Sequence, residues 1–238
     1  MRKYQSFYNN QHTKKIALKA AHYFRTRIAP LTMTLIVMVG QIWIAYTINF
    51  DFVWILPIAS GLMLISSIVA YSISHAKPSK SARALSVAVV VLLTLINLSC
   101  IVWFIYDMLN PDTITISHEL LLTGFALWVV NIGIFSLAYW ELDTDGPESR
   151  ALGTQEMLPN KIYPDFLFAQ QISSEPRLSP DDWIPGFIDY LYLSITTATS
   201  FSPSVPAPNT PMAKIMVGSE ALMSLFILGL IITRAISL

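Results

Sequence analysis

The chain has 238 residues, of which 54% are hydrophobic and 13% are charged, and its mean hydropathy is +0.54. A soluble domain could not bury that much apolar surface, so the composition predicts an integral membrane protein. Fifteen basic and fifteen acidic residues cancel, which leaves no global field to attract nucleic acid or an acidic substrate.

The first 30 residues form a basic segment. Residues 14–28 can form a helix with apolar and basic residues on different sides, a pattern typical of a helix lying on anionic lipid. The alternative is a solvated basic tail that only sets the orientation of the chain. A secretory signal peptide is not expected, because the charged region is too long and no small-residue cleavage site follows it.

Residues 31–142 contain four segments that are long enough to cross a membrane. A hydrocarbon core of about 30 Å takes about 20 helical residues, and the connections between the four segments are short, which predicts helical hairpins. A further span begins near Met212 and runs to the C-terminus. The predicted fold class is therefore an all-α transmembrane bundle, whose first four spans are Leu31 to Ile48, Phe52 to Ser74, Ala84 to Leu109 and Glu119 to Leu142.

Two less regular segments separate the fourth span from the last one. Residues 143–183 form an acidic, Pro-rich loop that is too broken for a core of its own, although it could pack as a cap on the bundle. Residues 184–238 combine the final span with a hydroxyl-rich helix, Ile184 to Phe201. That helix is about 18 residues long, close to the lower limit of what a membrane span needs. It could therefore be a short span or a re-entrant helix.

Lys and Arg counts in the loops predict the orientation, because cytoplasmic loops carry an excess of these residues. Seven basic residues precede the first span and three lie between the second and third, whereas the first and third loops carry none. This alternation predicts a cytoplasmic N-terminus and a cytoplasmic loop at residues 143–183. If Ile184 to Phe201 crosses completely, only Lys214 lies on the wrong side. We therefore favour six spans, with five spans and a re-entrant helix as the alternative.

Motifs of soluble enzymes are absent from the sequence. It has no Walker loop, GxGxxG, CxxC, HExxH or GxSxG pattern, and its four His residues are dispersed without neighbours at metal-ligand spacing. The single cysteine, Cys100, lies within an apolar run, where a small buried hydrophobe is the expected role. We expect no enzyme activity, no cofactor and no metal.

Polar residues inside the spans are the remaining candidates for function, because an ionisable side chain at membrane depth is costly and marks a functional site by default. Glu220 lies about two turns into the last span, with no Lys or Arg within four residues. It could handle a cation or a proton at a cavity, or it could lie near the headgroups, bonded to Ser or Thr hydroxyls. Asn97 and Asn131 lie in the middle of two spans, where amides commonly bridge helices.

The stretch YLYLSITTATSFSPSVP, which begins at Tyr190 and is followed by a span with Glu220, resembles the pore module of a potassium channel. That family has a pore helix, a Gly-Tyr-Gly filter and an inner helix. Here both filter glycines are missing, and Pro203 restricts the backbone where the filter would lie. The loop charges also predict that the fourth span runs into the cytoplasm, whereas the helix before such a pore loop runs outward from it. A potassium filter of the usual build is therefore not expected.

A second likeness covers about the C-terminal half of the chain. The stretches LWVVNIGIFSLAYWELDTDGP, PDFLFAQ, PGFIDYLYLSITTATSFSPSVP and AKIMVGSEALMSLFILGLIITRAI resemble a group of uncharacterised bacterial membrane proteins that are classified as a domain of unknown function. The resemblance implies a multi-pass protein of a bacterial inner membrane. It implies no known activity.

The sequence supports two functional hypotheses. In the first, the protein is channel- or transporter-like and passes an ion or a small solute, because clustered hydroxyls can replace part of a hydration shell. The second is a non-conducting scaffold or sensor that binds a partner through its cytoplasmic loop. The lipid bilayer is the expected partner under both, a homo-oligomer is possible and nucleic acid is not expected. The candidate polar path of the first hypothesis consists of Thr196, Thr197, Thr199, Ser200, Ser202 and Glu220.

Overall fold

The computed structural model describes residues 28–47, scattered residues between 54 and 65, and residues 80–109, 117–151, 164–173, 175, 183–201 and 206–236. Most of these residues are helical, as the sequence predicts. The basic segment before residue 28, most of the predicted span Phe52 to Ser74, and Ser202 lie outside the described residues.

Four of the described helices are long and apolar enough to cross a membrane. They are the helix Ile28–Thr47, α3 (Lys80–Leu109), α4 (Ser117–Leu142) and α9 (Pro211–Ile236). They lie at the positions of the first, third, fourth and last predicted spans and are the candidate membrane-spanning helices of the described chain. The fold is therefore that of a helical membrane protein.

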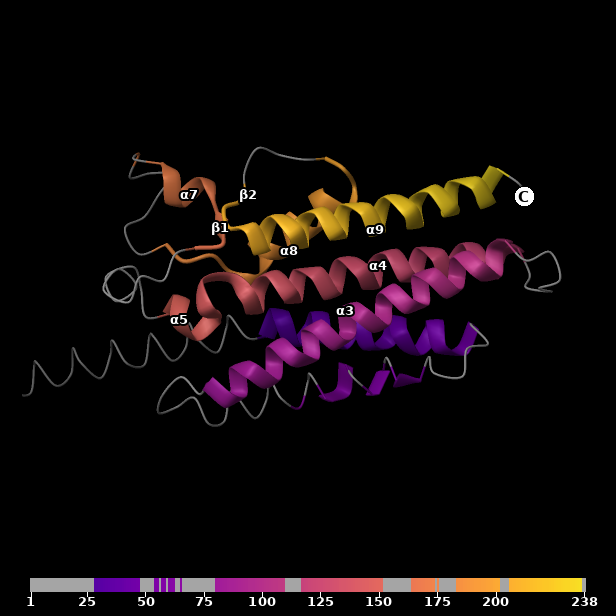
Figure 1. Cartoon of the computed structure of the whole chain (residues 1–238), viewed down its shortest axis with the longest axis horizontal. Coiled ribbons are helices and arrows are strands. Elements are labelled where there is room, and N and C mark those ends of the chain that lie inside the picture. The colour runs from indigo at the N-terminus through magenta and orange to yellow at the C-terminus, as the bar shows by residue number, and fades with distance from the viewer. Residues whose placement is uncertain are drawn as a thin grey trace, which may run out of the picture.

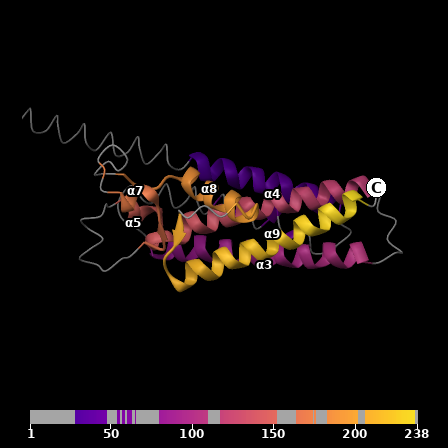
Figure 2. The same cartoon turned by 90° about the horizontal axis from the view of Figure 1, so that it is seen from above.

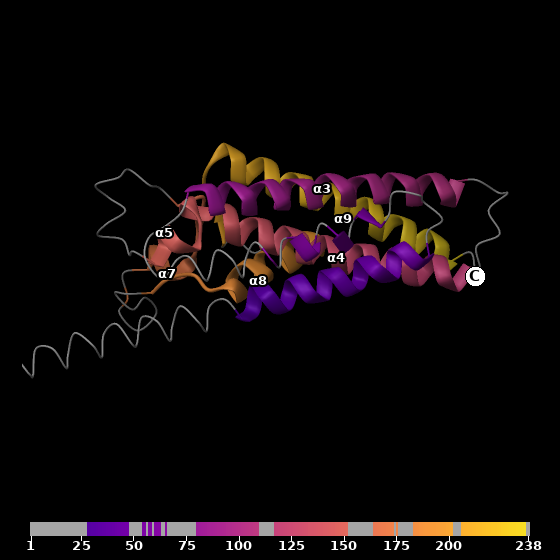
Figure 3. The same ribbon diagram turned by 90° about the horizontal axis from the view of Figure 1, so that it is seen from below.

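Helix α4 is the centre of the bundle. It lies between α3 and α9, and the helix Ile28–Thr47 packs along it as well (Figures 1, 2 and 3). Within its apolar stretch 67% of the residues are buried, against 22% for α9. Gly133 allows the first helix to approach closely, because a Cβ atom there would lie 2.4 Å from Val37 Cγ2. Because α4 contacts several helices, its polar side chains can bond to groups of more than one neighbour.

Helix α8 (Phe187–Ala198) is only 12 residues long. At 1.5 Å per residue it extends about 18 Å, well short of a hydrocarbon core of about 30 Å. Its start is defined by Gly186, whose backbone N–H donates to the Asp189 carboxylate at 2.7 Å, and its end by Ser200, which has a positive φ of 59°. Local signals at both ends therefore confine the helix within the longer segment predicted from the sequence.

The end of α4 carries a compact cap. It comprises the 3₁₀ helix η1 (Asp143–Asp145), the short helices α5 (Pro147–Ala151) and α7 (Ala169–Ile172), and two strands, β1 (Phe166–Leu167) and β2 (Ala207–Pro208). The strands pair antiparallel, and Phe166 of β1 and the nearby Phe168 are buried. The part of the acidic loop that the structure describes thus packs as a cap, one of the possibilities that the sequence left open. The strand pair is an addition to the predicted all-α fold.

The segment that contains α8 begins and ends at this cap. Phe187 packs against Trp140 near the end of α4, with ring centroids 6.0 Å apart. After α8 the chain returns to β2, which pairs with β1, and Asn209 N–H donates to Asp165 O at 2.7 Å. Figure 1 shows β1, β2 and the start of α9 at the same end of the bundle. Six full crossings, the count that we favoured from the loop charges, are not confirmed by this arrangement.

Candidate functional site

Glu220 lies deep in the bundle. It is nine residues after Pro211, the first residue of α9, which at 1.5 Å per residue places it about 14 Å along the helix. Its side chain is 0% exposed. The carboxyl group therefore lies inside the bundle, about one third of the way along the 26-residue helix.

Two hydroxyl groups from two other helices meet this carboxyl group. The Tyr139 hydroxyl of α4 lies 2.5 Å from Glu220 Oε2, and Ser194 Oγ of α8 is hydrogen-bonded to Glu220 Oε1. Ser194 Oγ also lies 2.9 Å from the backbone carbonyl oxygen of Ile132, on α4. Both Tyr139 and Ser194 are fully buried. The cluster of Glu220, Tyr139 and Ser194, here called the Glu220 cluster, therefore joins α4, α8 and α9.

A second polar group lies one helical turn along α9. The Asn131 amide donates to Ser224 Oγ at 3.0 Å, and the Asn97 amide donates to Asn131 Oδ1 at 2.9 Å. All three side chains are fully buried. This ladder joins α3, α4 and α9, and it confirms that Asn97 and Asn131 bridge helices, as predicted.

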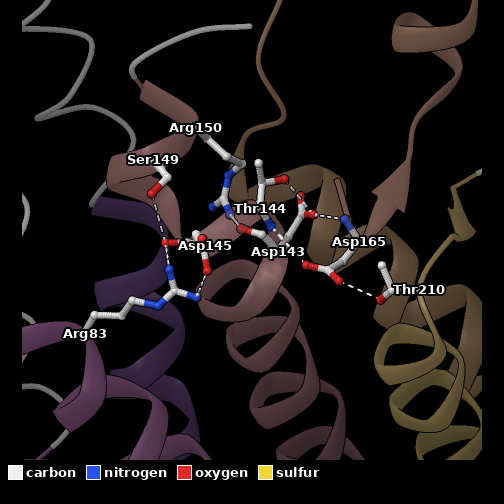
Figure 4. A network of polar contacts seen from close by, with 8 residues as sticks. All are labelled: Arg83, Asp143, Thr144, Asp145, Ser149, Arg150, Asp165 and Thr210. Atoms are coloured by element: carbon white, nitrogen blue, oxygen red, sulfur yellow. Dashed lines mark hydrogen bonds and ion pairs between the residues drawn. The ribbon is translucent and has the colours of Figure 1, made fainter. Parts of the chain in front are cut away.

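Asp143, at the end of α4, is the centre of the cap (Figure 4). Its Oδ1 accepts hydrogen bonds from Asp165 N–H at 2.8 Å, from Phe166 N–H at 3.3 Å and from the Thr144 hydroxyl at 2.9 Å. Its Oδ2 accepts from the Tyr190 hydroxyl of α8. One buried carboxylate thus connects the end of α4 to β1 and to α8.

Asp165 extends this network to α9, as Figure 4 shows. Its carboxylate accepts from Thr144 N–H at 3.1 Å and from the Thr210 hydroxyl at 2.6 Å. Thr210 Oγ in turn accepts from Ala213 N–H at 3.3 Å in the first turn of α9, the role of a helix N-cap. The start of α9 is therefore held to the end of α4 through side chains.

Arg150, on α5, is a buried cation of the cap, since the residue is only 2% exposed. It donates to Asp143 O at 2.6 Å and to Trp140 O at 2.8 Å, two carbonyls at the C-terminal end of α4. It also lies over the rings of Trp140 and Tyr190, at 4.4 and 5.0 Å from the centroids. A cation at this place satisfies carbonyls that a helix end leaves without partners.

Burial shifts the pKa of two titratable groups near the start of α8. Burial raises the pKa of the Tyr190 hydroxyl well above its usual value, an effect that Arg150 opposes and Asp143 increases. Tyr190 therefore remains a hydrogen-bond donor to Asp143 at physiological pH. Burial also raises the pKa of the Asp189 carboxyl, although the hydrogen bond from Gly186 N–H lowers it.

Among the described residues, none of the hydroxyls predicted for the polar path is hydrogen-bonded to Glu220. Thr196 donates to Tyr192 O and Leu193 O, and Thr199 donates to Ile195 O, so both hydroxyls bond to carbonyls of their own helix. Thr197 is half-buried and Ser200 is exposed. The hydroxyl of α8 that contacts Glu220 is instead that of Ser194.

Our sequence reasoning did not assign a role to Tyr139, Ser194, Asp143 or Arg150. The spacing of these residues contained part of the information. Asp143, directly after α4, lies four residues after Tyr139 of α4, and Ser194 lies four residues after Tyr190 on α8. Residues four apart share one face of a helix. The pairs Tyr139 with Asp143 and Tyr190 with Ser194 each predict a polar face, but the spacing alone does not tell which faces meet.

In the part of the chain that the structure describes, no group of three His, Cys, Asp or Glu side chains could hold a metal ion. Comparison of the chain with protein-family models, with curated proteins and with solved structures gives no match. The likenesses noted from the sequence thus stay predictions. Fold and site together define a helical membrane protein with a buried carboxyl cluster at the junction of three helices.

Proposed function

We propose that this protein is channel- or transporter-like and passes an ion or a small solute, with Glu220 as the charge-sensitive group on the path. The observation that supports this proposal is a fully buried carboxyl group about one third of the way along α9, whose described contacts are hydroxyl groups of α4 and α8. An ionisable residue at membrane depth is expensive to maintain and marks an ion pathway or a proton relay by default.

The hydroxyls of α8 are the proposed lining of this path. Ser194 joins it through its contact with Glu220. Thr196 and Thr199 contribute less in the described state, because their hydroxyl hydrogens are already donated to carbonyls of α8. Thr197, Ser200 and Ser202 remain in the proposed path.

For the topology we propose five spans and a re-entrant α8, with the cap on the cytoplasmic side of a bacterial inner membrane. The length of α8 and the pairing of β1 with β2 support this arrangement. Arg83, Arg150 and Lys214 then all lie at the cytoplasmic end, as the excess of basic residues in cytoplasmic loops requires. Only Arg234 would lie at the opposite end.

Cysteine labelling tests this topology. In a Cys100→Ala background, Ser149→Cys and Asn209→Cys would be labelled with a membrane-impermeant reagent in oriented vesicles. The re-entrant arrangement predicts that both residues react from the cytoplasmic side. Reaction from opposite sides would mean that the segment between them crosses the membrane.

Reconstitution tests the function. The purified full-length protein would be placed in liposomes, and fluxes of protons, monovalent cations and small solutes would be measured under an imposed gradient. We expect a flux that Glu220→Gln abolishes. Glu119→Gln is the matched control, because Glu119 is an exposed carboxylate in the first turn of α4, and its removal should leave the flux unchanged. Absence of flux from well-folded wild-type protein would overturn the proposal and favour the scaffold or sensor hypothesis.

A further inference from the structure

The Glu220 cluster contains three oxygen-to-oxygen contacts, and each needs one hydrogen. They join Tyr139 Oη to Glu220 Oε2, Glu220 Oε1 to Ser194 Oγ, and Ser194 Oγ to Ile132 O. Tyrosine and serine hydroxyls each supply one hydrogen. An ionised Glu220 would therefore leave two hydrogens for three contacts, and one pair of acceptors would face each other.

A protonated Glu220 removes this conflict. Tyr139 then donates to Oε2, the Glu220 O–H group donates to Ser194 Oγ, and Ser194 donates to Ile132 O. Every contact has one hydrogen, and each hydroxyl donates once. The neutral form also avoids burying a charge whose described partners are uncharged hydroxyl groups, which is unfavourable in a site without water.

We infer that the Glu220 cluster is a proton-binding site, and that the bound proton holds α8 in its place in the bundle. The inference deepens the proposed function by naming the proton as the ion that Glu220 binds. Its relevance to transport rests on that proposed function. Ser194 is the only residue of α8 that the described contacts place on Glu220. Loss of the proton leaves a hydrogen missing at Ser194, which favours movement of α8 away from Ile132 and Glu220.

Among the described residues, few groups face Glu220 from the neighbouring helices. Helix α4 presents Tyr139, and α8 presents Ser194. The titratable residues of α8 are Asp189, Tyr190 and Tyr192. Asp189 and Tyr190 lie five and four residues before Ser194, Tyr190 is bonded to Asp143, and Tyr192 is exposed. Among the described residues, the next polar groups are the uncharged ladder of Ser224, Asn131 and Asn97. A pH response of the cluster is therefore assigned to Glu220.

Infrared spectroscopy of the reconstituted full chain tests the protonation directly. At neutral pH we expect a carbonyl-stretch band of a protonated carboxylic acid that is absent from Glu220→Gln and retained in Glu119→Gln. In Tyr139→Phe the band should persist at a higher frequency, since one hydrogen bond to the carbonyl oxygen is lost. This second variant keeps Glu220 in place, so it decides the matter even if Glu220→Gln folds poorly. A wild-type spectrum without the band overturns the inference.

Labelling at the end of α8 tests the coupling. In a Cys100→Ala background, Ser200→Cys should react faster with a thiol reagent at high pH than at neutral pH, and the increase should exceed the one that ionisation of the thiol alone provides. In Glu220→Gln only the increase due to the thiol should remain. Equal pH dependence with and without Glu220 would contradict the coupling. The results separate this inference from the proposed function: a protonated-acid band without flux refutes transport alone, whereas a Glu220-dependent flux without the band refutes proton binding alone.

Discussion

Replacement of Asp143 with Ala should destabilise the protein more than any other single change in the cap. The carboxylate accepts hydrogen bonds from two backbone N–H groups, those of Asp165 and Phe166, and from the hydroxyls of Thr144 and Tyr190. Asp143 itself is 0% exposed, so water does not replace the lost acceptor without rearrangement. The substitution leaves buried donors without partners.

The magnitude follows from the number of donors. A buried donor that loses its acceptor costs about 1–3 kcal/mol. The Thr144 hydroxyl can rotate toward another acceptor, and the bond from Phe166 N–H is long at 3.3 Å, so Asp165 N–H and the Tyr190 hydroxyl dominate the cost. Since neighbouring losses are not additive, we expect a decrease in the free energy of unfolding of about 3 kcal/mol for Asp143→Ala. Asp143→Asn should cost about 1 kcal/mol, because it keeps one acceptor oxygen.

Asp145 provides the control in the same turn. Its carboxylate is about half exposed and pairs with Arg83 at 2.8 Å, an arrangement that contributes about 0–1 kcal/mol at a surface. Asp145→Asn is the suitable change, because φ at this position is 60° and Asn tolerates that conformation. Unfolding in mixed micelles, followed by tryptophan fluorescence, would give the three free energies. If Asp143→Ala were no more destabilising than Asp145→Asn, the reasoning about the cap would be wrong.

Three further predictions concern the other contacts of the bundle. Arg150→Lys should lower the free energy of unfolding by about 1–2 kcal/mol, because an ammonium group cannot reach both carbonyls while stacking on Trp140. The same fluorescence titration measures this loss, and an unchanged unfolding midpoint would contradict the prediction. Asn131→Leu removes two interhelical hydrogen bonds and should cost about 1 kcal/mol, which unfolding in micelles would show. Gly133→Ala should cost about 1–3 kcal/mol, since its Cβ would lie 2.4 Å from Val37 Cγ2. Gly229→Ala, where no atom of the described chain lies within 4 Å of the added carbon, should instead be neutral or stabilise α9 by up to about 1 kcal/mol; similar effects of the two alanines would refute the close contact at Gly133.

The membrane character and the positions of the spans could be predicted from the sequence, because hydropathy over about 20 residues is a local property that needs no knowledge of neighbours. The four long helices of the structure lie where that criterion places them. The bridging role of Asn97 and Asn131 was predictable for the same reason, since a buried amide in a span has to find a partner on another helix.

Only the tertiary structure decided how α8 runs and what Glu220 contacts. The length of α8 depends on Gly186 and Ser200, and its return to the cap depends on the pairing of Phe166 with Pro208, residues 42 positions apart in the chain. Glu220 was recognisable as unusual from its place in an apolar run. Its partners come from α4 and α8, and the choice of Tyr139 and Ser194 over the other hydroxyls depends on how three helices are rotated against one another. Helical periodicity tells which residues share a face, whereas packing decides which faces meet.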